Sequence, residues 1–137
     1  MIIDTSALIA ILRAEEEASE MAHAIERAQI RKISAANYLE TAVVIDASRD
    51  PVASRRFDQV METAKVHVEP VTHDQALIAR GAYRDFGKGS GHLAGLNFGD
   101  CFAYALAKST GEALLFKGND FSHTDITPAL PSAPGST

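Results

Sequence analysis

The sequence is poor in features that would mark a secreted or membrane protein. It has a single cysteine, Cys101, among 137 residues. An internal disulfide is therefore excluded, which suits a reducing compartment. No apolar stretch approaches the roughly 20 residues of a membrane span. The opening Met1-Ile2-Ile3-Asp4 lacks the basic region and apolar run of a signal peptide. We therefore expect a cytoplasmic protein without a membrane segment.

An excess of positive charge is also missing. The chain has 13 Lys and Arg against 18 Asp and Glu, which gives a formal net charge of −5 at pH 7. This balance argues against a nucleic-acid-binding protein, because such proteins are usually basic. The objection weakens if several carboxylates gather at one site, because divalent cations held there would supply positive charge where a phosphate must sit.

The length is that of one domain, and a domain of this size buries about two-thirds of its unfolded surface without help from a disulfide or a structural metal. We expect residues 1–127 to form this domain. Residues 128–137 are rich in Pro, Ser and Gly and are expected to be a disordered tail.

The apolar pattern alternates between short strands and helices. Its periodicity predicts strands at 2–3, 30–34, 66–71 and 113–116 and a short one from Ile126, with helices at 5–13, 15–29, 35–48, 52–64, 72–86 and 98–109. This order predicts an α/β fold, with a mostly parallel sheet of about five strands flanked by helices. In such sheets, functional groups gather just beyond the carboxyl ends of the strands.

Three acidic residues fall at such positions. Asp4 follows the first strand, Asp100 opens the last long helix, and Asp120 lies shortly after the strand at 113–116. Each has an ordinary structural explanation. Asp4 would cap a helix, Asp100 would favour the positive end of its helix, and Asp120 would form a turn. Together they indicate a site, because one sheet would bring them to one edge.

A fourth acid, Glu40, lies within the most apolar helix of the chain. A carboxylate there costs free energy unless it is paired, hydrogen-bonded or bound to a metal. Asn37 lies three residues earlier on the same helix face and is placed to serve it, or to form a capping-box-like pair with it.

Clustered carboxylates repel one another, and Mg²⁺ or Mn²⁺ would remove that repulsion because hard cations prefer oxygen ligands. One or two such ions would also polarise a phosphodiester and activate a water. Thr5 and Ser6 are expected either to orient the Asp4 carboxylate or to be simple helix-start hydroxyls.

Four ordered segments resemble those of PIN-domain nucleases, in particular the VapC toxins of toxin–antitoxin pairs. They are Ile2–Leu8, Ala36–Thr41, Leu96–Cys101 and Leu115–Phe121, and the match extends to about Ile126. The resemblance implies a PIN-like three-layer fold and a toxic RNA endonuclease dependent on Mg²⁺ or Mn²⁺. It places the family's catalytic acids on Asp4, Glu40, Asp100 and Asp120, with metal bound by the three aspartates.

The same resemblance implies partners. VapC-like proteins usually form homodimers, and a VapB-like antitoxin covers the active site, which would give a heterotetramer or a larger assembly. We expect these partners and an RNA substrate for this chain.

The sequence leaves further residues open. Asp125 is either an additional acid of the site or, as we favour, a loop acid. Lys88 and His92 lie in a Gly-rich segment that either contacts RNA or, as we favour, only connects two helices. Lys117 follows a strand, so it would contact phosphate, pair with a carboxylate or remain solvated.

Two other functions fit the sequence less well than a nuclease. A catalytically silent RNA- or partner-binding module on the same fold would be expected to lose some of the four acids, and all are present. A signalling receiver domain requires an acidic pair after the first strand, whereas Asp4 is followed by Thr5 and Ser6.

Overall fold

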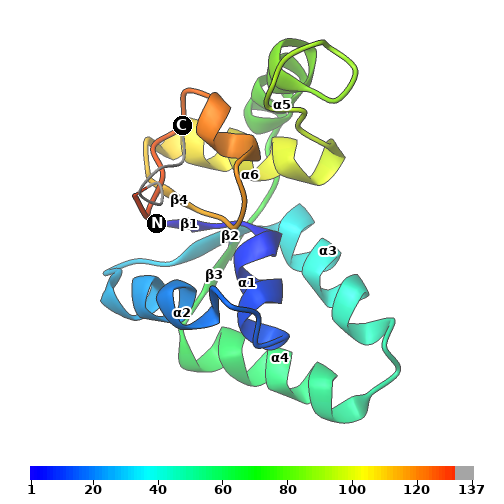
Figure 1. The fold of residues 1–137 in the computed structure, drawn as a ribbon, viewed down its shortest axis with the longest axis vertical. Helices are drawn as coiled ribbons and strands as arrows, with labels where there is room; N and C mark the ends of the chain where they lie inside the picture. Colours follow the sequence, from blue (N-terminus) through cyan, green and yellow to red (C-terminus); the bar gives the residue numbers. More distant parts are fainter. Residues whose placement is uncertain (132–137) are drawn as a thin grey trace.

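Four parallel strands form the centre of the molecule (Figure 1). The structure is a computed structural model that describes residues 1–131. The strand order across the sheet is β3-β2-β1-β4. The strands are β1 (Ile2–Ile3), β2 (Lys32–Ser34), β3 (His67–Glu69) and β4 (Leu114–Leu115).

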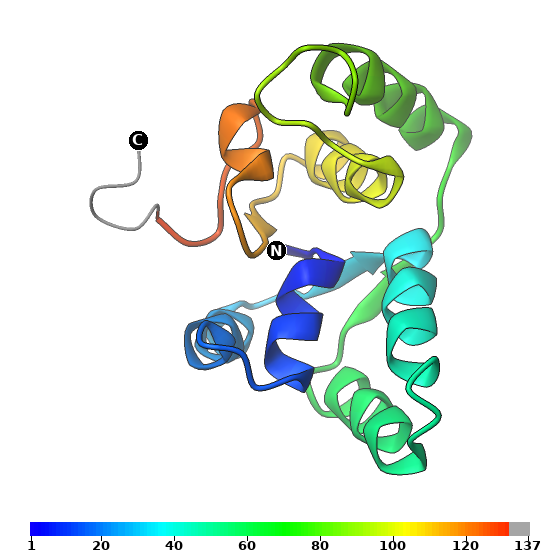
Figure 2. The same ribbon diagram turned by 45° about the vertical axis from the view of Figure 1, so that its right-hand side comes forward.

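Helices cover both faces of this sheet, as Figure 2 shows. Ile2 and Leu114 pack with α5 (His73–Phe86) and α6 (Phe98–Thr110) on one face. Ile3 and Leu115 point to the opposite face, because successive side chains of a strand alternate. There they contribute to a second core with α1 (Thr5–Leu12), α2 (Ala18–Arg27), α3 (Ala35–Asp46) and α4 (Pro51–Thr63). All four of these strand residues are fully buried, as expected for parallel strands covered on both sides.

The three-layer α/β prediction is therefore confirmed, and the six predicted helices are all present. Local signals set several of their ends. Pro51 occupies the first turn of α4, where its missing N–H costs nothing, and Asp50 caps that helix. Gly111 ends α6 in the left-handed conformation, with φ of 69°. Among residues 1–131, no helix is both long and apolar enough to cross a membrane.

The carboxy-terminal part differs from the prediction in two ways. The sheet has four strands rather than about five, because the segment after Ile126 forms only an isolated bridge between Leu114 and Pro128. Residues 120–123 form a short 3-10 helix, η1 (Asp120–His123), that the pattern did not reveal.

The structure also describes the first residues of the segment expected to be a tail. The Ala129 N–H donates to the Leu114 carbonyl at 2.8 Å, and Ala129 and Leu130 pack against the core beneath. The chain therefore stays attached beyond Pro128, since these apolar side chains gain burial there. The rest of the predicted disordered tail, residues 132–137, lies outside the described residues.

Candidate active site

Asp4 lies at the carboxyl end of β1, where it caps α1. Its side chain is only 3% exposed. Its Oδ2 accepts hydrogen bonds from the Ser6 backbone N–H at 3.0 Å and from the Ser6 hydroxyl at 2.6 Å. The Asp4 carboxylate thus both caps α1 and belongs to the candidate site. Ser6 engages its Oδ2, and its Oδ1 has no hydrogen bond to the described residues.

Glu40 is bound by two side chains in the predicted apolar helix, now α3. Its Oε1 accepts from the Thr5 hydroxyl at 2.6 Å and from the Asn37 amide at 3.3 Å. The same amide, fully buried, donates to the Gly99 carbonyl of α6 at 2.9 Å. This arrangement explains how an apolar helix tolerates the carboxylate. It also assigns Thr5 to Glu40 rather than to Asp4, whose partner is Ser6.

Asp100 belongs to the first turn of α6 and forms a capping box with Asn97. Its Oδ2 accepts from the Asn97 N–H at 3.0 Å, and its own N–H donates to Asn97 Oδ1 at 2.9 Å. The pair satisfies two backbone donors of the helix end. Sequence reasoning did not single out Asn97, although its spacing of three residues from an acid is the signal of such a box.

Electrostatics join the four acids into one cluster. Burial raises the pKa of Asp4 to about 7, against hydrogen bonds from Ser6, and the charges of Asp100 and Glu40 raise it further. Burial likewise raises the pKa of Asp100; a backbone hydrogen bond from Asn97 opposes this, and the charges of Asp120 and Glu40 add to it. No ion pair of the described residues includes any of the four acids. Within the described part of the chain, the cluster therefore has no ion-pair partner to balance its charge.

The donor chemistry of the cluster fits a hard divalent cation. Asp4, Glu40 and Asp100 each engage one oxygen with the protein and keep another without a hydrogen bond to residues 1–131. As the side chains stand, no three metal-binding side chains in that range are arranged to hold one ion. The acids would thus have to close by small side-chain movements around an ion, with their unbonded oxygens as ligands.

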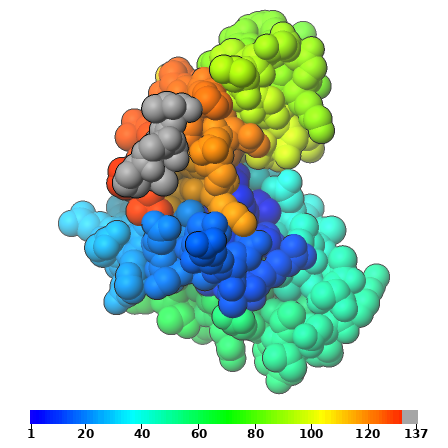
Figure 3. Space-filling model, viewed as in Figure 1, coloured from blue at the N-terminus to red at the C-terminus, as the bar shows by residue number. Residues whose placement is uncertain are grey.

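Asp120 lies in the segment after β4, and its negative charge acts on Asp100. It is exposed and opens η1, after a turn at Gly118 whose φ is 94°. The Lys117 N–H donates to the Ser6 hydroxyl at 2.9 Å, so the residue that holds Asp4 also holds this segment. Figure 3 shows the segment seated against the amino-terminal helices.

Two further predicted residues have partners outside the acid cluster. Lys117 pairs through Nζ with Glu15 at 3.2 Å and Glu17 at 3.5 Å, which is the carboxylate-pairing alternative. Asp125 accepts from Tyr104 with one oxygen and pairs with Lys108 through the other. Both carboxylate oxygens of Asp125 are therefore engaged by protein side chains.

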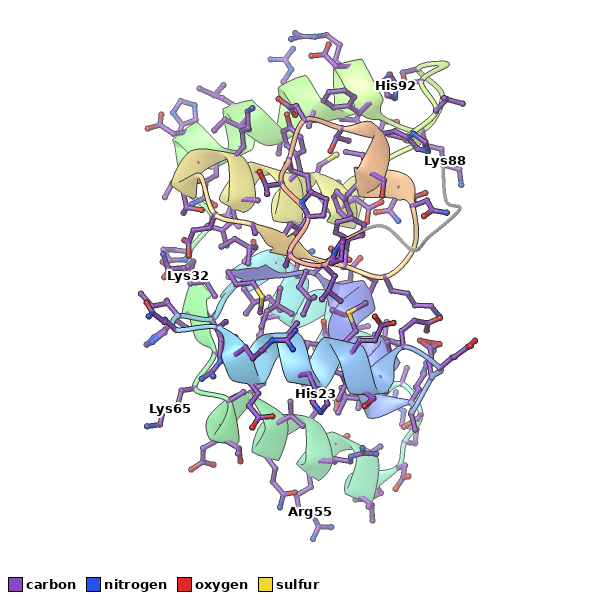
Figure 4. The ribbon with its side chains drawn as sticks, turned by 60° about the vertical axis from the view of Figure 1, so that its left-hand side comes forward. His23, Lys32, Arg55, Lys65, Lys88 and His92 are labelled. Carbon is purple, nitrogen blue, oxygen red and sulfur yellow. The ribbon has the colours of Figure 1, made fainter. Side chains whose placement is uncertain are left out.

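Lys88 and His92 lie in the loop after α5, at one end of the molecule (Figure 4). Both are exposed. The His92 ring packs edge-on against Phe86, and its Nδ1 accepts from the Ala94 N–H at 3.0 Å. No hydrogen bond within residues 1–131 joins Lys88 or His92 to the four acids.

Comparison with known proteins defines the family. A PIN-domain family model matches residues 1–126. The chain is 58% identical over 130 residues to Ribonuclease VapC28 of Mycobacterium tuberculosis, which covers 95% of this chain and 98% of that protein. It is 53% identical over 132 residues to Ribonuclease VapC30 of the same organism, covering 96% of this chain and all of that protein.

Solved structures share the fold. The crystal structure of M. tuberculosis VapC20, described as a sarcin-ricin loop cleaving toxin, superposes with a TM-score of 0.73 at 18% identity, over 95% of this chain and 98% of that one. A toxin–antitoxin complex from Klebsiella pneumoniae gives a TM-score of 0.66 at 19% identity, over 88% and 89%. The chain belongs to the PIN-domain family and, within it, to the VapC group.

Proposed function

We propose that this protein is a toxic, metal-dependent RNA endonuclease that hydrolyses phosphodiester bonds. The observation that carries the proposal is the buried Asp4 carboxylate, coupled to Asp100 and Glu40 and without an ion-pair partner among residues 1–131. The names of the VapC relatives, which describe ribonucleases, support the same reaction for this chain.

Asp4, Asp100 and Asp120 would hold Mg²⁺ or Mn²⁺, one or two ions at the site. A cation bound there supplies polarisation of the scissile phosphodiester and a lower pKa for the attacking water. Glu40 completes the site and positions the water, because its Oε1 is fixed by Thr5 and Asn37 while its Oε2 accepts no hydrogen bond in the described chain. Hydrolysis by water would leave 5′-phosphate and 3′-hydroxyl ends.

Charge explains why RNA binding should require the ion. The chain has a net charge of −5, and the four acids repel a phosphate. RNA would therefore bind productively only after a bound cation has made the charge at the acid cluster positive. The exposed loop residues Lys88 and His92 remain proposed as weaker contacts to RNA phosphates.

The proposal includes partners and place of action. A VapB-like antitoxin would cover the acid cluster, and the toxin would act as a homodimer that forms a heterotetramer or larger assembly with it. A structural neighbour described as a toxin–antitoxin complex supports the antitoxin as a partner. A toxin that cuts cellular RNA would act in the cytoplasm.

The test is cleavage of a structured RNA by purified protein in Mn²⁺, with and without a chelator. We expect cleavage in Mn²⁺ with 5′-phosphate products, and its abolition by chelation. Cleavage that persists in excess chelator would overturn metal dependence. Absence of cleavage, together with unchanged growth inhibition by an Asp100→Asn variant expressed alone, would favour a silent binding module.

A further inference from the structure

One glycine beside the acid cluster has no room for a side chain while Glu40 keeps its position. Gly99 lies in the first turn of α6, is buried, and immediately precedes Asp100. A Cβ built on it would stand 2.7 Å from Glu40 Cδ and 2.8 Å from Oε1, with Oε2 closer still. Cβ atoms essentially never approach other atoms within 3.0 Å. The Glu40 carboxylate thus fills the space that a side chain at residue 99 would occupy.

Two hydrogen-bond donors hold the Glu40 carboxylate in that space. Thr5 and Asn37 both donate to Oε1, and the Asn37 amide also donates to the Gly99 carbonyl. One buried amide therefore ties Glu40 of α3 to the residue before Asp100 in α6. In Figure 2 the beginning of α3 lies under the beginning of α6. The charge of Glu40 accordingly acts on Asp100.

We propose that Gly99 is a positioning residue for the nuclease site, because its missing side chain is what admits the Glu40 carboxylate beside Asp100. The inference deepens the proposed function and rests on it for its catalytic meaning. The three nearest atoms that a Cβ would meet all belong to the flexible end of Glu40 rather than to backbone. A methyl group at residue 99 would therefore expel the carboxylate while leaving the helix intact.

The first experiment compares Gly99→Ala with Glu40→Ala and with the double variant. Gly99→Ala and Glu40→Ala should each lower RNA cleavage about 10–100-fold, the range typical of lost supporting groups at metal sites. The double variant should be no worse than Glu40→Ala, because the carboxylate is already gone. Mn²⁺ binding, followed by the loss of the free-ion EPR signal, should weaken equally in all three, because each variant moves or removes the Glu40 charge that lies beside the metal-binding aspartates.

Gly81→Ala is the matched control. Gly81 is also helical, in α5, and a Cβ there would meet only the end of Arg84 at 3.8 Å. This variant should keep full cleavage and Mn²⁺ binding. Its Tm should rise by about 2–4 °C, since alanine favours helix over glycine.

Thermal melts separate a steric effect from simple misfolding. In the Glu40→Ala background, adding Gly99→Ala should raise or preserve the Tm, as at Gly81. In the parent, the same change should lower the Tm or leave it unchanged, because the Glu40 hydrogen bonds are lost. Unfolding by Gly99→Ala in both backgrounds would overturn the proposal, since alanine would then clash with something other than Glu40.

Cleavage and Mn²⁺ binding by the variants give two further ways to overturn the proposal. Parent-like cleavage and Mn²⁺ binding by Gly99→Ala would overturn the proposal, as would a double variant whose losses multiply. If the parent itself cuts no RNA, the proposed function fails. The melts and the Mn²⁺ titrations would still decide whether Gly99 admits Glu40.

Discussion

The two ends of the same parallel sheet treat their carboxylates in opposite ways. At the amino end, Glu112 precedes β4 and accepts from Lys32 at 2.7 Å and from the Met1 ammonium at 2.8 Å. At the carboxyl end, Asp4 follows β1 and is bonded only to the neutral Ser6. One acid has two protein cations as partners, and the other has none in the described chain.

The pKa values record this difference. Burial alone would raise the pKa of Glu112, but hydrogen bonds and charges from Lys32 and the amino terminus lower it to about 2. Burial raises the pKa of Asp4 to about 7. Glu112 therefore stabilises the fold as a charge, whereas the charge on Asp4 destabilises it. An acid kept at such a position indicates a function that stability alone does not explain.

Replacing Asp4 by Asn should have the largest effect on function. Asn remains a good helix cap and can still accept from Ser6, but it cannot bind a cation as a carboxylate does. RNA cleavage should fall at least about 100-fold. The raised pKa means that the acid destabilises the fold increasingly as pH rises from about 4 to 7 and fully above 7.

The same variant should therefore gain stability at pH 8 without metal, on the order of 1–3 kcal/mol, measured by urea unfolding. At pH 4 the gain should disappear, because Asp4 is then protonated in the folded parent. If Asp4→Asn lost both activity and stability at pH 8, the charge of Asp4 would stabilise the fold, which would contradict the contrast with Glu112.

Glu112→Gln should show the reverse behaviour. Because the pKa of Glu112 is lowered, its contribution is full above about pH 4.5 and is lost as pH falls towards 2. The side chain is 24% exposed, so we expect a loss of about 1–2 kcal/mol at pH 7 rather than the full value of the shift. RNA cleavage should be unchanged. If the parent and Glu112→Gln were equally stable at pH 7, Glu112 would not stabilise the fold, and the contrast with Asp4 at the other end of the sheet would be lost.

Asp125→Asn should have the smallest effect. Asp125 and its partner Lys108 are about half exposed, and such pairs contribute roughly 0–1 kcal/mol. Cleavage within twofold of the parent would agree with a loop acid. A loss comparable to that of Asp4→Asn would instead place Asp125 in the metal site.

The sequence predicted most of this architecture because its signals are local. Alternating apolar runs defined the strands and helices, and strand ends located Asp4, Asp100 and Asp120. Glu40 stood out only as a misplaced charge, and the family resemblance assigned it to the site. Its partners are long-range: Thr5 is 35 residues away, and Gly99 lies on another element.

Periodicity could not reveal what tertiary packing decides. The role of Gly99 depends on where α3 meets α6, and neither helix encodes that crossing in its own pattern. The attachment of Ala129 depends on an open edge of β4. A Pro- and Ser-rich composition predicts disorder without reference to such an edge, so it could not reveal this attachment.

The most direct test of the central idea is calorimetric titration with Mn²⁺. At pH 8, the parent and Glu112→Gln should bind the ion equally well, and Asp4→Asn should bind it far more weakly. At pH 6, binding to the parent should weaken about tenfold, because protons compete for an acid whose pKa is about 7. Undiminished Mn²⁺ binding by Asp4→Asn at pH 8 would contradict a metal site built on the acids at the carboxyl end of the sheet.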